Sequence, residues 1–289
     1  MKRKRKKIIL VVILFFFTFW LVQAQRTMKF RETDDDAKEE FLGKGIKLLT
    51  KTIKAGDSHL HYVQAGSDTM PTLFFVHGSP GSWNVFKSYL LDDDLMKRYR
   101  MISVDRPGFG YSDFNHPKNL AQQSRIINYL LDSIQNNKPI FLVGHSLGGP
   151  LIIKMYLDNV ALISGLVILA GALDPKAEKP EKWRPVLFKT PLNYFVPGAM
   201  RPSNEELWYL KKDLKQLDKE LDKVICPVWL MHGDKDNLVP LGNVDYARQK
   251  FKNAKSLDIK ILPGANHFIP WTHFNEIKEL LLNLPTDHT

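Results

Sequence analysis

The amino-acid sequence predicts an α/β fold with one mostly parallel, eight-stranded sheet flanked by helices. Short apolar runs alternate with helix-like segments along most of the 289 residues, which is the pattern of a doubly wound sheet. Runs such as 73–76 and 167–169 are apolar throughout, as expected of parallel strands that are covered on both faces. The expected strands are residues 47–54, 59–64, 72–76, 101–104, 140–143, 166–169, 228–231 and 259–262.

The first two of these runs alternate polar and apolar residues, which favours an antiparallel edge of the sheet. Residues 172–225 break the alternation, because they hold six prolines and then a charged, helix-like segment at 205–223. We therefore expect a mainly helical lid at 172–225, inserted after the sixth strand into a core formed by 45–171 and 226–289. The expected helices of that core are residues 124–134, 151–157, 244–251 and 275–282.

The composition is that of a globular protein, with 44% hydrophobic and 25% charged residues. It excludes a disordered, collagen-like or many-span membrane chain. Six of the basic residues behind the formal charge of +10 lie at positions 2–7, so the charge gives no reason to expect a nucleic-acid partner. The single cysteine, Cys226, can form neither an internal disulfide nor a structural zinc site alone. No metal or organic cofactor is implied.

The N-terminus has the pattern of a targeting segment. The basic block at 2–7 precedes an apolar run from Ile8 to Val22, and Val22-Gln23-Ala24 is similar to a signal-peptidase site. Residues 1–24 are therefore either a cleaved signal peptide or an uncleaved signal anchor that tethers the chain to a membrane. Both interpretations place the catalytic domain outside the cytoplasm, either exported to the periplasm or exterior or membrane-anchored. Residues 25–44 are charged and are expected to be a solvated polar tether.

The chemistry is indicated by Gly144-His145-Ser146-Leu147-Gly148, which matches G-x-S-x-G between an expected strand and an expected helix. In that context the serine lies on a sharp turn at the carboxyl edge of the sheet. The start of the helix also brings backbone N–H groups to the serine, that of Leu147 first. The alternative is a tight turn whose serine only caps the helix.

Three further motifs have the order found in the α/β-hydrolase superfamily. They are His-Gly-Ser-Pro-Gly at 77–81, Asp-Arg-Pro-Gly-Phe-Gly-Tyr-Ser at 105–112, and His-Gly-Asp-Lys-Asp at 232–236 paired with Gly-Ala-Asn-His at 264–267. With the serine motif, they make residues 47–284 resemble this superfamily, in its esterase, epoxide hydrolase-like and proline iminopeptidase-like branch. The resemblance implies the α/β-hydrolase fold and a serine hydrolase with a lid.

The resemblance also implies the catalytic residues. Ser146 is the expected nucleophile, His267 the base that activates it, and Asp236 the acid that orients the base, because the family's chain order is serine, acid, histidine. The expected oxyanion donors are the backbone N–H groups of Ser79 and Leu147. The competing candidates are Asp234 and Asp174 for the acid and His273 for the base.

Aromatic residues are the candidates for the substrate pocket. Trp83 and Trp271 lie next to motif loops and are the expected substrate-binding residues. The aromatic residues of the lid either line the pocket or pack the lid onto the core; they are Trp183, Phe188, Tyr194, Phe195, Trp208 and Tyr209. His59 and His61 alternate on a strand that we expect to lie at the surface.

The expected activity is hydrolysis of a small-molecule carboxylic ester with an apolar part, through an acyl-enzyme. Epoxide hydrolases and haloalkane dehalogenases share the loop at 79–81 but use a carboxylate nucleophile, in whose place this chain has Ser146. Amide, lactone or carbon–carbon bond hydrolysis remains open, and an aminopeptidase would need acids such as Glu205 and Glu206 to bind an amine. A non-catalytic binding protein on the same fold is the alternative from another class.

Overall fold

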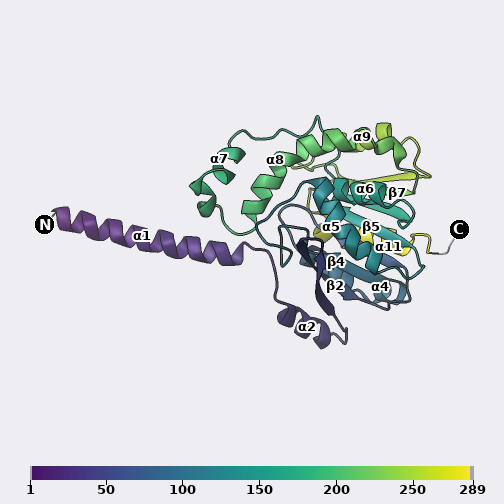
Figure 1. Ribbon diagram of the computed structural model, residues 1–289, viewed down its shortest axis with the longest axis horizontal. Helices are drawn as coiled ribbons and strands as arrows, with labels where there is room; N and C mark the ends of the chain where they lie inside the picture. Colours follow the sequence, from purple (N-terminus) through teal and green to yellow (C-terminus); the bar gives the residue numbers. More distant parts are fainter. Residues whose placement is uncertain (1, 287–289) are drawn as a thin grey trace.

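A computed structural model describes residues 2–286 of the chain. An eight-stranded sheet runs through the body in the order β1-β2-β4-β3-β5-β6-β7-β8 (Figure 1). β1 and β2 pair antiparallel at one edge, β2 is antiparallel to β4, and the remaining neighbours are parallel. All eight expected strands are confirmed within two residues at each end: β1 Leu49–Ala55, β2 Ser58–Ala65, β3 Thr72–Val76, β4 Arg100–Val104, β5 Ile140–His145, β6 Gly165–Leu169, β7 Val228–Gly233 and β8 Leu257–Leu262.

Helices cover both faces of the sheet, and successive strand residues supply the two layers. Phe74 packs in one apolar cluster and Phe75 in the other, because neighbouring side chains of a strand point to opposite faces. The first cluster includes residues of α5 Leu120–Ser133, α6 Gly148–Asp158, α8 Met200–Leu217 and α9 Gly242–Lys250. The second includes residues of α2 Asp34–Gly43, η1 Trp83–Phe86, α3 Lys87–Leu90, α4 Asp93–Arg98, α10 Ile269–Thr272 and α11 Phe274–Leu282.

Between β6 and β7 the chain leaves the strand–helix alternation. This inserted segment contains α7 Arg184–Phe188, η2 Pro191–Phe195, α8 and η3 Leu221–Lys223. The buried residues of α8 pack into the first cluster, whereas α7 and η2 have no buried residues. The segment is therefore attached to the body along α8, with α7 at its outer edge (Figure 1).

The expectation of a solvated tether at 25–44 is wrong. Thr33 caps α2 by accepting the N–H of Asp36, and the acidic residues 34–36 form its first turn, where negative charge is favourable. Ala37 and Phe41, four residues apart on one helical face, are fully buried. The ring of Phe41 lies 6.4 Å from that of Trp83, so this amphipathic helix is part of the second layer. The high charge of the segment concealed the two apolar positions that dock it.

The N-terminal segment is a single helix, α1 Lys2–Thr27, that projects from the body (Figure 1). Among the described residues it is the one helix long and apolar enough to cross a membrane. It continues without a break through Val22 and Ala24, and Ala24 is buried against the body. The pattern that resembles a cleavage site thus lies within a packed helical turn.

Candidate active site

The G-x-S-x-G sequence forms a tight turn between β5 and α6. Ser146 has a φ of +54°, a left-handed conformation that is strained for an L residue. Position 148 must be glycine, because a Cβ there would lie 2.3 Å from the carbonyl oxygen of Val76. The N–H of Ser146 donates to the carbonyl of Leu169 at 2.9 Å, which holds the turn at the carboxyl end of the parallel strands.

His267 and Asp236 form a buried hydrogen-bonded pair. Nδ1 of His267 lies 2.7 Å from Oδ2 of Asp236, and Oδ1 of Asp236 accepts the N–H groups of Leu238 and Val239 at 2.9 and 2.8 Å. Burial by itself would raise the pKa of Asp236, but these hydrogen bonds, with His267 first, hold it below its ordinary value. Because an ionised carboxylate only accepts hydrogen bonds, Nδ1 carries the proton and Nε2 is left as the basic nitrogen.

The structure gives the competing candidates other partners. Asp234 accepts the backbone N–H of Gly264 at 2.7 Å and so closes the turn between two loops. Asp174 accepts a backbone N–H two residues further along the chain at 2.7 Å. His273 contacts the hydroxyl of Thr272 at 2.9 Å, at an exposed position between α10 and α11. Of the three candidate acids, Asp236 is the one that the structure brings to His267.

A cavity of about 960 Å³ opens beside Ser146 and His267. Its lining includes one carboxyl side chain, Glu178, and one guanidinium, Arg184. Burial raises the pKa of Glu178, although the positive charges of Lys211 and Arg184 oppose this shift. Most of the other lining side chains are apolar: Phe30, Pro80, Val85, Leu147, Ala172, Met200, Leu207, Leu210, Leu238, Val239, Phe268 and Trp271.

The loop after β3 lies directly against the serine turn. A Cβ on Gly78 would approach the Cβ of Ser146 to 2.8 Å, so glycine permits this contact. Ser79 and Leu147 both line the cavity, and Leu147 is the N-cap of α6, before the first turn whose N–H groups lack intrahelical acceptors. The Ser79 hydroxyl donates to Ser203 of α8 at 2.8 Å. Its backbone is thereby tied to the inserted segment.

Histidines of the motifs hold the site as neutral groups. Burial, reinforced by the neighbouring His267, lowers the pKa of His145 to about 3. Nε2 of His145 can then donate to the backbone carbonyl of His267, which lies 3.0 Å away. Burial and the charge of Arg106 place the pKa of His77 well below its ordinary value, and Nε2 of His77 accepts the N–H of Arg106 at 3.0 Å. These contacts fix the loops that carry His267 and Gly78.

A buried ion pair joins the inserted segment to the loop after β4. Arg106 contacts both carboxylate oxygens of Glu206, at 2.8 and 2.9 Å, and the two side chains are 0% and 2% exposed. The same guanidinium donates to Gln123 of α5 at 2.8 Å and to the carbonyl of Gly78 at 2.8 Å. Glu206, an expected candidate for binding a substrate amine, is therefore committed to Arg106. Glu206 and Arg106 are both visible in the sequence, but no sequence signal indicated that they form an ion pair.

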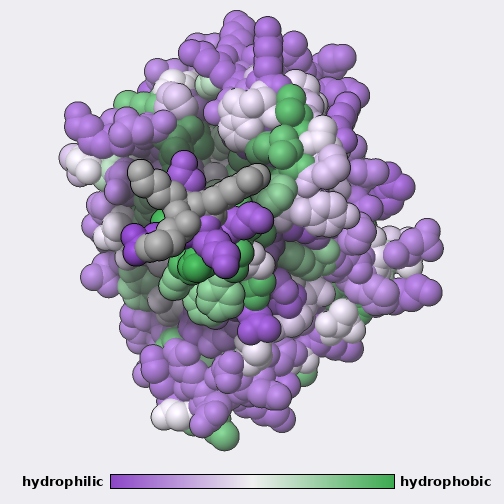
Figure 2. All heavy atoms as spheres, turned by 90° about the vertical axis from the view of Figure 1, so that its left-hand side faces the viewer, coloured by the Kyte–Doolittle hydropathy of each residue, from purple (hydrophilic) through white to green (hydrophobic). Residues whose placement is uncertain are grey.

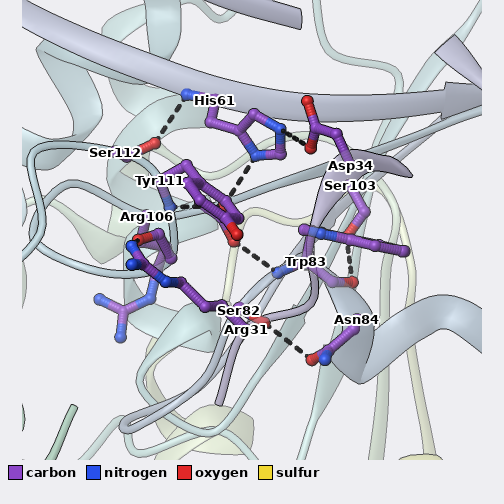
Figure 3. Close-up of polar contacts among 12 residues, drawn as sticks. Arg31, Asp34, His61, Ser82, Trp83, Asn84, Ser103, Arg106, Tyr111 and Ser112 are labelled. Carbon is purple, nitrogen blue, oxygen red and sulfur yellow. Dashed lines mark hydrogen bonds and ion pairs between the residues drawn. The ribbon is translucent and has the colours of Figure 1, made fainter. Parts of the chain in front are cut away.

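A second buried network begins at His61, which we expected at the surface and which is 1% exposed. Its ring nitrogens lie 2.8 Å from Asp105 and 3.0 Å from Asp34 of α2 (Figure 3). Burial would lower the pKa of His61, but the hydrogen bonds and charges of Asp105 and Asp34 raise it above 6.5. Asp105 also accepts the N–H groups of Trp83 and Tyr111 at 2.8 and 2.9 Å. The network thus braces the loops next to the cavity and binds α2 to them.

The prediction of Trp83 as a substrate-binding residue is wrong. Trp83 is fully buried, with its ring 6.4 Å from that of Phe41, and it does not line the cavity. Its backbone N–H donates to Asp105 and its carbonyl accepts the hydroxyl of Ser103 (Figure 3). Its position next to a motif loop gave no information about the direction of its side chain. Trp271 does line the cavity and is 49% exposed. None of the six aromatic residues of the inserted segment lines it.

Within residues 2–286, no group of three or more His, Cys, Asp or Glu side chains is arranged to hold a metal ion.

Comparison with known proteins agrees with this architecture. A family model described as the alpha/beta hydrolase fold matches residues 71–195. Epoxide hydrolase 3 from Mus musculus is 23% identical, over 82% of this chain and 76% of its own length. Epoxide hydrolase 1 from Caenorhabditis elegans is 31% identical, over 35% of this chain and 25% of its own length.

A solved structure, the esterase EaEST from Exiguobacterium antarcticum, superposes with a TM-score of 0.63 at 20% identity, covering 81% of this chain and 98% of the esterase chain. At this identity the likeness concerns the fold. The family model, the relatives and the topology together place the chain in the α/β-hydrolase superfamily.

Proposed function

We propose that this protein is a serine hydrolase that cleaves carboxylic esters with an apolar part through an acyl-enzyme. The hydrolase relatives support a hydrolytic activity in general. The observation that carries the finer proposal is the convergence of Ser146 and His267 on one largely apolar cavity, with His267 held by Asp236 at 2.7 Å. A strained serine, an oriented imidazole and adjacent backbone N–H groups are the parts that acyl transfer requires.

The reaction follows from these positions. Nε2 of His267 takes the proton of the Ser146 hydroxyl while the oxygen attacks the ester carbonyl, and the N–H groups of Ser79 and Leu147 stabilise the oxyanion. Collapse of the intermediate expels the alcohol, which receives the proton from His267, and leaves an ester on Ser146. Water, deprotonated by His267, then attacks this ester, and the acid product leaves as Ser146 recovers its proton. Asp236 stays ionised and stabilises the imidazolium in both halves.

The cavity supports the choice of an ester over a peptide-like substrate. A substrate with a free ammonium group needs ionised acids beside it, but Glu206 is paired with Arg106. Glu205 hydrogen-bonds Tyr209, and Glu178 is the one acidic residue in the cavity lining. The raised pKa of Glu178 weakens its use as a permanent anion. The apolar lining instead suits the acyl or alcohol chain of an ester.

The epoxide hydrolase relatives suggest a second reaction, which the serine disfavours. The resemblance implies that such enzymes attack the epoxide with a carboxylate and form an ester that water can cleave. Attack on an epoxide by Ser146 would form an ether, which has no carbonyl for water to attack. We therefore expect no turnover of styrene oxide by this protein, whereas rapid turnover would favour the epoxide reaction.

The test uses the full chain purified in mild detergent, with p-nitrophenyl acetate and butyrate as substrates. We expect hydrolysis by the natural sequence and a loss of several orders of magnitude in kcat for Ser146→Ala, by analogy with about 10⁶ for nucleophile loss in a serine protease. A fluorophosphonate probe should label the natural protein at Ser146. Folded protein that neither hydrolyses the esters nor reacts with the probe would favour a non-catalytic binding protein.

We also propose that α1 is retained as a membrane anchor that leaves the catalytic domain outside the cytoplasm. The expected cleavage position, after Ala24, lies in a continuous helical turn, and Ala24 is buried. Gln25 bonds the carbonyls of Tyr194 and Val196, so the end of α1 is part of the fold. N-terminal sequencing of the membrane fraction tests this placement, and a mature protein that begins at Gln25 would contradict it.

A further inference from the structure

The outer edge of the inserted segment packs along the apolar helix α1. Gln25 of α1 donates to the carbonyls of Tyr194 and Val196 at 3.1 and 3.0 Å, and its side-chain oxygen accepts the N–H of Gly198 at 3.1 Å. Further along α1, the ring of Phe17 lies 6.3 Å from that of Phe195. These contacts set η2 beside the half of α1 that is nearest to the body.

The contact between Phe17 and Phe195 sets the depth of η2 relative to the apolar run. Phe17 lies five residues before Val22, the last residue of that run. At 1.5 Å per helical residue, the contact lies about 7.5 Å from the end of the run. Membrane-surface helices bury their apolar faces by about 5–10 Å. If α1 spans a bilayer upright, Phe195 therefore reaches into the boundary between headgroups and acyl chains.

The exposed side chains of the outer edge suit that position. Five large apolar side chains of α7, η2 and the residue before α7 are between 46% and 73% exposed: Trp183, Val186, Leu192, Tyr194 and Phe195. The stretch 183–201 has no acidic residue, and its exposed cation Lys189 is attracted to anionic lipid, whereas Arg184 is paired with Glu181. Viewed toward α1, this side of the molecule shows apolar residues near its centre and hydrophilic residues around them (Figure 2).

The same surface continues to the mouth of the cavity. Phe30, three residues after the end of α1, lines the cavity and is 43% exposed. Arg184 of α7 and Met200 of α8 line it as well, on either side of η2 along the chain. A bilayer that meets α1 and η2 would therefore also lie against the rim through which a substrate enters.

We propose that α7 and η2 form a second membrane contact that seats the mouth of the catalytic cavity against the lipid surface, so that amphipathic esters enter from the bilayer. The occupant of this face is a lipid bilayer with anionic headgroups. The proposal rests on the anchoring role proposed for α1, and its substrate part rests on the proposed ester hydrolysis. Its membrane part is tested without any measurement of activity.

The first experiment measures depth with the full chain in vesicles of zwitterionic and anionic phosphatidyl lipids. The native Cys226 is buried and its pKa is raised to about 12 by burial, so an introduced cysteine is the site that an environment-sensitive NBD label modifies. The labels are placed by Phe195→Cys in η2, by Phe15→Cys in α1, and by Val160→Cys at the opposite end of α6. Val160 is exposed and follows a helix that begins at the serine turn and runs 11 residues away from it.

We expect the label at 195 to be quenched by a nitroxide near the headgroup more than by one deep in the acyl chain. The label at 15 should be quenched by the deep nitroxide, and the label at 160 by neither. Quenching at 15 without quenching at 195 would overturn the proposal. A blue-shifted label at 195 that lipid nitroxides do not quench would place Phe195 in a protein interface, and this also overturns it. Absence of quenching at 15 would remove the anchor and the proposal with it.

The second experiment separates entry from chemistry. The variant Val186→Ser/Leu192→Ser/Phe195→Ser removes three apolar side chains that do not line the cavity, and Tyr129→Ser/Val160→Ser is the control on other exposed apolar positions. We expect hydrolysis of a long-chain ester in the vesicles to fall by about tenfold or more in the triple variant. Three lost apolar contacts exceed the 1.4 kcal/mol that a factor of ten represents. Hydrolysis of soluble p-nitrophenyl acetate should stay unchanged.

A triple variant that hydrolyses the long-chain ester in vesicles as fast as the natural protein does, or that loses activity equally on both substrates, would overturn the entry route. If neither substrate is hydrolysed by the natural protein, the proposed function fails, and the quenching pattern still decides whether η2 lies in lipid.

Discussion

Replacing Glu206 by alanine removes one partner of the buried ion pair that links the inserted segment to the site. In the natural protein Arg106 is 0% exposed and contacts both oxygens of Glu206. After Glu206→Ala the guanidinium keeps its hydrogen bonds to Gln123 and to the carbonyl of Gly78, but it loses the carboxylate with which it forms its ion pair. A buried charge without a counter-charge is costly, because the protein interior solvates it far less than water does.

The magnitude follows from the burial of the pair. Breaking a buried ion pair by removing one partner costs about 3–5 kcal/mol, whereas an exposed pair contributes about 0–1 kcal/mol. In a protein of this size each kcal/mol shifts Tm by about 2–4 °C. We therefore expect Glu206→Ala to lower Tm by at least about 6–12 °C. Activity per folded molecule should fall as well, since Arg106 also holds the carbonyl of Gly78, next to Ser146.

The assay is thermal unfolding of the full chain in detergent, together with p-nitrophenyl butyrate hydrolysis well below Tm. Glu205→Ala is the matched control, because it removes the same charge one residue away, where the carboxylate contacts Tyr209. We expect the free energy of unfolding of this control to lie within about 1 kcal/mol of that of the natural protein. The same Tm for Glu206→Ala and Glu205→Ala would refute the reasoning about the buried pair. Full recovery of stability, but not of activity, in Arg106→Met/Glu206→Leu would separate the two roles.

Three further predictions concern the acid, the histidine network and the buried indole. Asp236→Asn should lower kcat with p-nitrophenyl esters by about 10⁴-fold, as for the acid of a serine protease, and Asp234→Asn should lower it far less. The reverse ranking would show that Asp234 is the catalytic acid. Stabilisation by the charged pair of His61 and Asp34 is fully present below pH 6.5 and is lost as pH rises through the raised pKa of His61. In denaturant unfolding, Asp34→Asn should therefore lower the free energy of unfolding more at pH 6 than at pH 9. The same loss of stability at both pH values would contradict this. Trp83→Ala should lower the free energy of unfolding by about 3–5 kcal/mol. A normal Tm together with a raised KM would instead indicate that Trp83 contacts the substrate.

The sheet was predictable because its signals are local and redundant. Each of β3, β5 and β6 is an apolar run whose length and flanking turns leave few alternatives to a buried strand. The elbow was predictable for the same reason, since the sequence around Ser146 places a strand, a turn and a helix in immediate succession. Asp236 and His267 came from their order along the chain in the family, and the structure brings them together.

The features that sequence reasoning missed depend on contacts between distant segments. Helix α2 hides two docking residues, Ala37 and Phe41, among charges, and its charge content alone favoured solvent. Trp83 was placed in the pocket from its neighbours in sequence, but the side chain points into the second apolar layer. The pairing of Arg106 with Glu206 joins residues 100 positions apart, and no periodicity or spacing records such a contact.

The two missed polar networks meet at the loop after β4, and this meeting has a mechanical consequence. Asp105 binds His61 and, through it, Asp34 of α2, while the adjacent Arg106 binds Glu206 of α8 and the loop beside Ser146. Arg31, between α1 and α2, donates to the carbonyl of Gly110 on the same loop at 3.0 Å. The segment that follows α1 is therefore fastened to the loops of the site at several points. A flexible tether would let the domain rotate freely relative to α1, whereas these contacts fix the orientation of the cavity relative to α1, as the proposed entry of substrate from the bilayer requires.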